Sequence, residues 1–82
     1  NQHFQGKVMI HFRTLGLERE TLMAVKDILA CHKGNIDTRL HFIFPDNKER
    51  VVKVAEELRI KPSDEVLGQI ELLLGEGAIL FE

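Results

Sequence analysis

Two glycines near the end of the chain, Gly75 and Gly77, interrupt the apolar run LLLGEGAILFE and raise the question of a phosphate-binding loop. Such loops place a strand before the glycines and a helix after them, so that the positive end of the helix faces the anion. Here helical spacing precedes Gly75, and a short apolar run typical of a strand follows Gly77. We therefore predict that Gly75 ends a helix and that Gly77 turns the chain into a final strand.

Two histidines, His11 and His41, form a second candidate site, because imidazole is a common zinc ligand. Both occupy outward positions of alternating segments, KVMIHFR (7–13) and TRLHFIF (38–44). We expect the strand order 4-1-3-2, in which these segments are not neighbours, so the histidines would stand roughly 10 Å apart. No third ligand is evident, and we predict solvated histidines and no metal site.

The remaining reactive side chains have structural explanations. Cys31 falls near the C-terminal end of a predicted helix, where the dipole disfavours a thiolate, and we expect it to be buried or half-buried. Asp64 and Glu65 suit a helix start, and Asp46 suits a turn. Because no acid, base and nucleophile converge, we predict no catalytic residue and no cofactor in this segment.

Hydrophobic spacing predicts the elements that position these residues. Alternation indicates strands at 7–13 and 38–44, and spacing of three and four residues indicates a helix from Glu18 to Lys33 that Gly34 caps. The stretch ERVVKVAEELRI (49–60) fits a helix as well as a strand. Its β-branched cluster directly after a short turn favours a hairpin strand with a bulge or break near Glu56.

A second helix begins after Pro62, with Ser63 as its N-cap, and a last strand covers 78–81. The order β-α-β-β-α-β predicts an α+β fold, the split β-α-β or ferredoxin-like arrangement, with two helices on one face of an antiparallel sheet. The 82 residues make one domain, with 1–6 as a flexible lead-in. Because the chain begins at Asn1, we expect it to be an excised part of a longer protein.

Composition narrows the function classes. The net charge is −2, and residues 43–82 carry five Lys/Arg against nine Asp/Glu, so the domain alone is a poor nucleic-acid binder. A single cysteine and the lack of a long apolar run favour a cytoplasmic protein that contacts no membrane. The phenylalanines of the strands are expected to face inward, which disfavours RNA recognition by base stacking.

The chain resembles the extreme C-terminal domain of the α subunit of bacterial DNA polymerase III. The similar residues are LMAVKDILACHKGN (22–35), the strand TRLHFIF and, above all, RIKPSDEVLGQIELLLGEGAI (59–79). The resemblance implies that the parent is the replicative DNA-directed DNA polymerase, a nucleotidyltransferase that uses Mg²⁺ in a palm domain absent here. It also implies a protein-interaction role for this segment in DNA replication, as the tether to the τ subunit of the clamp loader in the replisome, while other domains of the parent bind DNA.

Some members of this family also carry a clamp-binding peptide near their C-terminus, of the form Gln-x-x-Leu-x-Leu/Phe, which makes the sliding clamp a second candidate partner. Gln69–Leu74 has similar letters but falls in a predicted helix, whereas such peptides bind extended. Ile79-Leu80-Phe81 is terminal and apolar but lacks the glutamine, and an edge strand is the favoured interpretation.

The partner surface that we predict is the outer sheet face together with the last strand: Lys7, Met9, His11, Arg13, Arg39, His41, Ile43, Ile79, Leu80 and Phe81. The alternative is a regulatory domain that binds a small effector such as an amino acid at a dimer interface. That domain would use the loop that begins at Arg13 and ends at Gly16.

Overall fold

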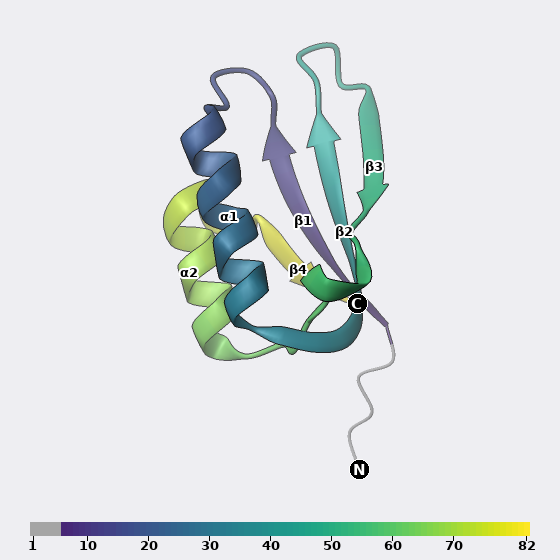
Figure 1. Ribbon diagram of the computed structural model, residues 1–82. Coiled ribbons are helices and arrows are strands. Elements are labelled where there is room, and N and C mark those ends of the chain that lie inside the picture. The colour runs from purple at the N-terminus through teal and green to yellow at the C-terminus, as the bar shows by residue number, and fades with distance from the viewer. Residues whose placement is uncertain (1–5) are drawn as a thin grey trace.

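The computed structural model describes residues 6–82, so the expected lead-in, apart from Gly6, lies outside the described part. Two helices cover one face of a four-stranded sheet (Figure 1). The elements are β1 (Lys7–Arg13), α1 (Arg19–Cys31), β2 (Lys33–Ile43), β3 (Glu49–Lys53), a 3₁₀ turn (Glu56–Leu58), α2 (Asp64–Leu74) and β4 (Ile79–Phe81). The predicted α+β class, the element order of the ferredoxin-like type and the common face of the helices are confirmed.

The sheet is mixed and its strand order is β3-β2-β1-β4, so the predicted antiparallel sheet and the order 4-1-3-2 were wrong. β1 and β2 are parallel neighbours, while β4 pairs with β1 and β3 pairs with β2 in the antiparallel sense. The order 4-1-3-2 would have put β3 in the centre. Arg50 lies opposite Phe42 and therefore on the helix side, where a central strand requires an apolar side chain. The more apolar β2 takes that place.

The core lies between the sheet and the helices. β1 contributes Val8, Ile10 and Phe12, and the ring of Phe12 stacks on Phe42 of β2 with centroids 5.0 Å apart. The remaining buried apolar core residues come from the helices, β4 and the segment after the 3₁₀ turn: Val25, Leu29, Ile60, Val66, Ile70 and Ile79. Phe44, expected inward, follows the end of β2 and is partly exposed.

The predicted hairpin strand with a break near Glu56 agrees with the structure, in which β3 ends at Lys53 and the 3₁₀ turn begins at Glu56. After one 3₁₀ turn, Ile60 bridges back to Lys33 and Ile36 at the start of β2. The buried hydroxyl of Thr38 accepts a hydrogen bond from the Ile60 N–H at 3.3 Å, which satisfies a backbone donor in the core.

Gly34 does not cap α1, contrary to the prediction. The helix ends at Cys31, and β2 already begins at Lys33. A Cβ on Gly34 would stand 2.4 Å from the Lys61 nitrogen and 2.5 Å from the Ile60 carbonyl. Glycine is required here because two backbone segments touch.

The ends of α2 follow the sequence-based expectation. The Ser63 hydroxyl accepts a hydrogen bond from the Val66 N–H at 3.1 Å. Gly75 follows the helix with φ 104°, and Gly77 turns toward β4 with φ 84°, both values that suit glycine. Within residues 6–82, neither helix has the length and the apolar composition needed to cross a bilayer.

Candidate functional site

The outer sheet face is the side of the sheet opposite the helices, and no element of residues 6–82 covers it (Figure 1). Cross-strand register assigns its members, because paired residues point to the same side. They are Lys7, Met9, His11, Arg13, Asp37, Arg39, His41, Ile43, Glu49, Val51, Lys53 and Leu80. The face therefore carries four basic and two acidic side chains among apolar and imidazole groups.

The basic side chains of this face are not all available to a partner. Arg39 donates from Nε and Nη2 to the two carboxylate oxygens of Asp37, at 3.3 and 3.0 Å, and Lys53 Nζ lies 4.0 Å from the same carboxylate. The hydrogen bond from Arg39 lowers the pKa of Asp37, and the nearby positive charges of Arg39, Lys53 and Arg59 act in the same direction. Arg13 is the exposed cation at the other end of the face.

The two histidines lie together, so the predicted separation was wrong. His11 and His41 are direct partners in the parallel β1–β2 pair, and their ring centroids are 4.8 Å apart. A third ligand group is present as well: Glu49 of β3 reaches Nδ1 of His41 with Oε2 at 2.5 Å. Both features depend on strand order and register, which the sequence pattern did not reveal.

The C-terminal strand contributes one residue to the outer sheet face. Leu80 lies opposite Met9 and is 47% exposed, whereas Ile79 is 2% exposed and belongs to the core. Phe81 pairs with Val8 on the helix side of the sheet. Ile79 therefore leaves the predicted partner surface, because a partner cannot reach it without unfolding the core. The edge-strand interpretation of this segment agrees with the structure.

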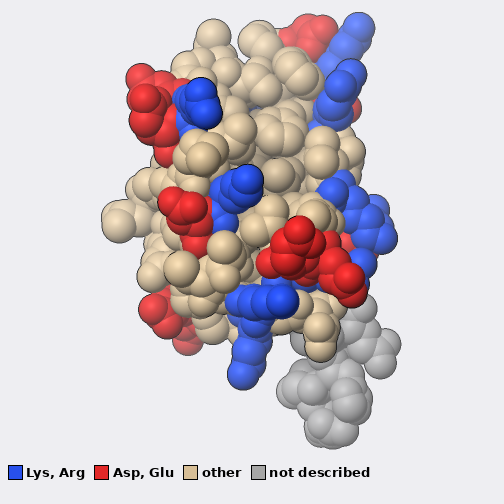
Figure 2. Space-filling model, in the orientation of Figure 1, with Lys and Arg blue, Asp and Glu red and all other residues tan. Residues whose placement is uncertain are grey.

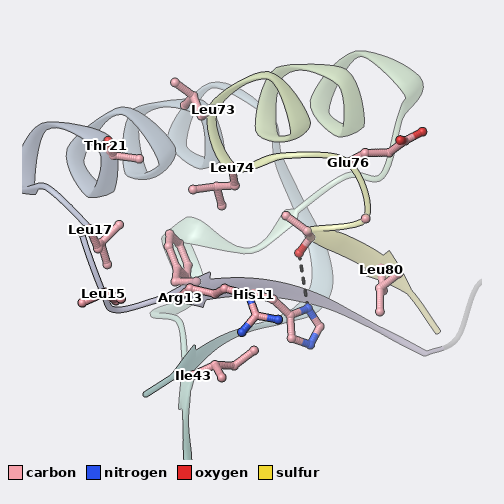
Figure 3. A pocket seen from close by; sticks show the side chains of 14 residues that line it. His11, Arg13, Leu15, Leu17, Thr21, Ile43, Leu73, Leu74, Glu76 and Leu80 are labelled. Atoms are coloured by element: carbon pink, nitrogen blue, oxygen red, sulfur yellow. Dashed lines mark hydrogen bonds between the residues drawn. The ribbon is translucent and has the colours of Figure 1, made fainter. Parts of the chain in front are cut away.

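A groove of about 540 Å³ opens where β1 extends beyond β4 (Figure 3). One wall comes from Leu15, Gly16 and Leu17 in the loop after β1, and the other comes from the end of α2 and the turn at 76–78. His11 and Arg13 line the groove beside the outer sheet face, and Leu15 is 80% exposed. The loop from Arg13 to Gly16, which the alternative hypothesis requires, borders this groove.

The other sequence candidates lie away from this face. Cys31 is exposed at the end of α1, which corrects the expected burial. Gln69–Leu74 is helical, and Ile70 within it is fully buried, so this stretch cannot bind as an extended peptide while the domain is folded. Oε1 of Gln69 instead accepts a hydrogen bond from Nε2 of His32 at 3.1 Å, which links α2 to the residue that caps the end of α1.

Charge is mixed on the one face of the molecule that Figure 2 shows. On the face seen in Figure 2, Lys and Arg side chains are interspersed with Asp and Glu, and neither sign forms a continuous patch. Nucleic-acid binding depends on a clustered positive surface. This face therefore gives no support to direct DNA binding.

The fold and the site define an α+β domain with one open sheet face. Comparison of the chain with protein-family models, curated proteins and solved structures finds no match.

Proposed function

We propose that this chain is a protein-interaction domain that docks a partner on its outer sheet face. The observation that carries the proposal is the composition of that face. Val51 and Leu80 are 48% and 47% exposed there, beside Ile43 and Met9, and four basic and two acidic side chains lie on the same face. Protein interfaces combine apolar contacts with a polar, charged rim in this way.

The partner in this proposal is the τ subunit of the bacterial clamp loader. The support is the resemblance of residues 22–35 and 59–79 to the C-terminal domain of the α subunit of DNA polymerase III. In this role the segment performs no chemistry. It tethers a cytoplasmic polymerase, whose palm domain holds Mg²⁺ and whose other domains bind DNA, to the replisome, with the sliding clamp as a second candidate partner.

Titration of purified τ against the chain by surface plasmon resonance tests the proposal. The double variant Arg13→Glu, Arg39→Glu reverses two charges on the outer sheet face, and we expect it to bind at least tenfold more weakly, roughly the loss seen when a hydrogen-bonded charge leaves an interface. Lys26→Glu, an exposed position on α1, is the matched control and should bind like the native chain.

Arg39→Glu places two carboxylates side by side with Asp37, so thermal melting of each variant must show that it is folded. Native affinity in a folded double variant would remove the outer sheet face from consideration. No binding of τ by the native chain would reject the partner.

The groove beside the loop after β1 supports a second candidate function, a regulatory domain that binds a small effector such as an amino acid. Its volume of about 540 Å³ is within the range of small-molecule sites. A thermal-shift screen against amino acids and nucleotides tests this function. A ligand that binds only the folded state raises Tm. If one of these compounds raises Tm and Leu17→Ser in the wall of the groove abolishes the rise, the effector domain is favoured over the tether.

A further inference from the structure

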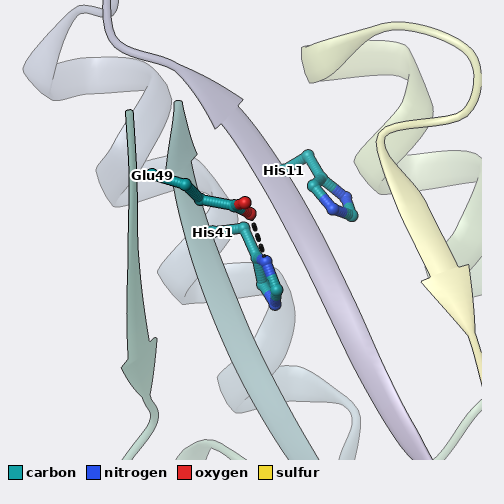
Figure 4. A group of neighbouring side chains, drawn as sticks. All are labelled: His11, His41 and Glu49. Atoms are coloured by element: carbon teal, nitrogen blue, oxygen red, sulfur yellow. Dashed lines mark hydrogen bonds and ion pairs between the residues drawn. The ribbon is translucent and has the colours of Figure 1, made fainter. Parts of the chain in front are cut away.

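Two imidazoles and one carboxylate meet on the outer sheet face, each from a different strand. His11 lies on β1, His41 on β2 and Glu49 on β3, and their ligand atoms all lie within 4.8 Å of one another. Figure 4 shows the Glu49 carboxylate at the ring of His41, with His11 on the neighbouring strand. We propose that these residues bind a divalent transition-metal ion, with Zn²⁺ as the probe.

The strand pairing itself brings the three residues together. His11 and His41 are register partners on adjacent strands. Glu49 is the partner of Ile43, which places it diagonally beside His41. Because the sheet holds the three Cα atoms in place, only side-chain rotation is needed to arrange the ligand atoms around one ion.

The distances allow an ion to enter after a small adjustment. Zinc binds imidazole nitrogen and carboxylate oxygen at about 2.0–2.2 Å in a tetrahedron, so neighbouring ligand atoms stand about 3.3 Å apart. The distance between Nδ1 of His41 and Oε2 of Glu49 is 2.5 Å, which is shorter than this spacing. The three ligand atoms lie within 4.8 Å of one another, so other pairs can be longer than it. The Glu49 side chain is 42% exposed and has room to move outward. The ion would take the place of the proton between Nδ1 and Oε2: Nδ1 gives that proton to solvent while Nε2 of His41 carries one, so that the ring binds as a neutral imidazole.

The ring of His11 already has a suitable orienting contact. Its Nδ1 lies 3.3 Å from the carbonyl oxygen of Ala78, within reach of an Nδ1–H hydrogen bond. Metal-binding histidines commonly donate one ring N–H to a backbone carbonyl, which leaves the other nitrogen with its lone pair available. In His11 that nitrogen is Nε2.

The ligand types determine the class of ion. Two imidazoles with one carboxylate suit Zn²⁺, Cu²⁺ or Ni²⁺, whereas Mg²⁺ and Ca²⁺ prefer oxygen ligands throughout. The nearest cations along β1 and β2 on this face are Arg13 and Arg39, and Arg39 is already paired with Asp37. Three protein ligands leave a fourth position for water or for a partner side chain. We expect micromolar affinity.

Calorimetric titration of zinc chloride into the chain tests the site. The native chain should bind one ion, and both His41→Ala and Glu49→Gln should lower the affinity at least tenfold, in line with the loss of a group that holds or orients a metal. The sequence contains two other histidines, His3 and His32. The double variant His3→Ala, His32→Ala is the matched control and should keep the native affinity.

The zinc dependence of Tm is a second readout, because an ion that binds only the folded state raises Tm. Glu49→Gln keeps the shape of an exposed side chain and is expected to fold. No zinc binding by the native chain, or native affinity in folded His41→Ala and Glu49→Gln, would overturn the site. Neither measurement involves τ, so the metal site and the tether are tested separately.

Discussion

The two sides of β1 have the same alternating pattern but different surroundings. Val8, Ile10 and Phe12 point toward the helices and are 0%, 0% and 1% exposed. Between them, Met9 and His11 point to the outer sheet face and are only half-buried. The alternating pattern places one set of side chains on each face of the sheet. Only the set that faces the helices is buried in a core, because the helices cover only that face. Burial therefore depends on what lies opposite the strand.

This difference separates stability from recognition within one strand. On the helix side, side chains fill volume, and removal of a methyl group leaves a cavity. On the outer sheet face, side chains form discrete pairs such as His41 with Glu49 and Arg39 with Asp37. Substitutions on the helix side should thus lower the free energy of unfolding strongly, whereas substitutions on the outer sheet face should change it little and act mainly on binding.

The largest effect is expected for Ile10→Ala. Ile10 is fully buried between the sheet and the helices, so the truncation should lower the free energy of unfolding by about 2–5 kcal/mol. Met9→Ala, one residue away on the outer sheet face, should cost about 1 kcal/mol or less. Urea denaturation of both variants measures the difference. Equal losses would show that the outer sheet face is as well packed as the helix side.

The second-largest effect is expected where the backbone at Gly34 touches the backbone of Ile60 and Lys61. Gly34→Ala pushes a Cβ against Ile60 and Lys61, and we expect a loss of about 1–3 kcal/mol, as for overpacked cores. Gly68→Ala is the matched control, because a Cβ on Gly68 in α2 would meet no atom of residues 6–82 within 4 Å outside its chain neighbours and the backbone of its own helix. Alanine at this position should stabilise the protein by about 0.5–1 kcal/mol. Stabilisation by both substitutions would mean that Gly34 does not touch the Ile60 backbone.

Features set by neighbouring residues along the chain could be predicted from the sequence. The alternation at 7–13, the Ser63 cap and the helix end at Gly75 all depend on contacts within a few residues. The second helix and the last strand followed from them. The strand order did not, because it depends on which strands have enough apolar inner side chains for the centre of the sheet. Arg50 on the inner side of β3 was the available signal.

The candidate site could be predicted only in part, because its members come together through the strand order and register. The outward direction of His11 and His41 was predictable from alternation, but their contact requires β1 and β2 to be neighbours in register. Glu49 could join them only once the hairpin register was known. The buried state of Ile79 depends likewise on the pairing of β4 with β1. A site built across strands needs the topology before its members can be recognised.

The smallest effect concerns the ion pair on the outer sheet face. The hydrogen bond from Arg39 lowers the pKa of Asp37 from 3.8, so ionised Asp37 contributes stability above that pH and loses it as the pH falls through the lowered value. Asp37→Asn should therefore be slightly less stable than the native chain at neutral pH, and the difference should shrink below pH 3.8. Urea denaturation at neutral pH and below pH 3.8 measures this difference in the free energy of unfolding.

The same substitution in an Arg39→Gln background is the control. It should have less effect at neutral pH, because the main partner of Asp37 is gone. A stability difference that stays constant from neutral to acidic pH would mean that the pair adds nothing to folding.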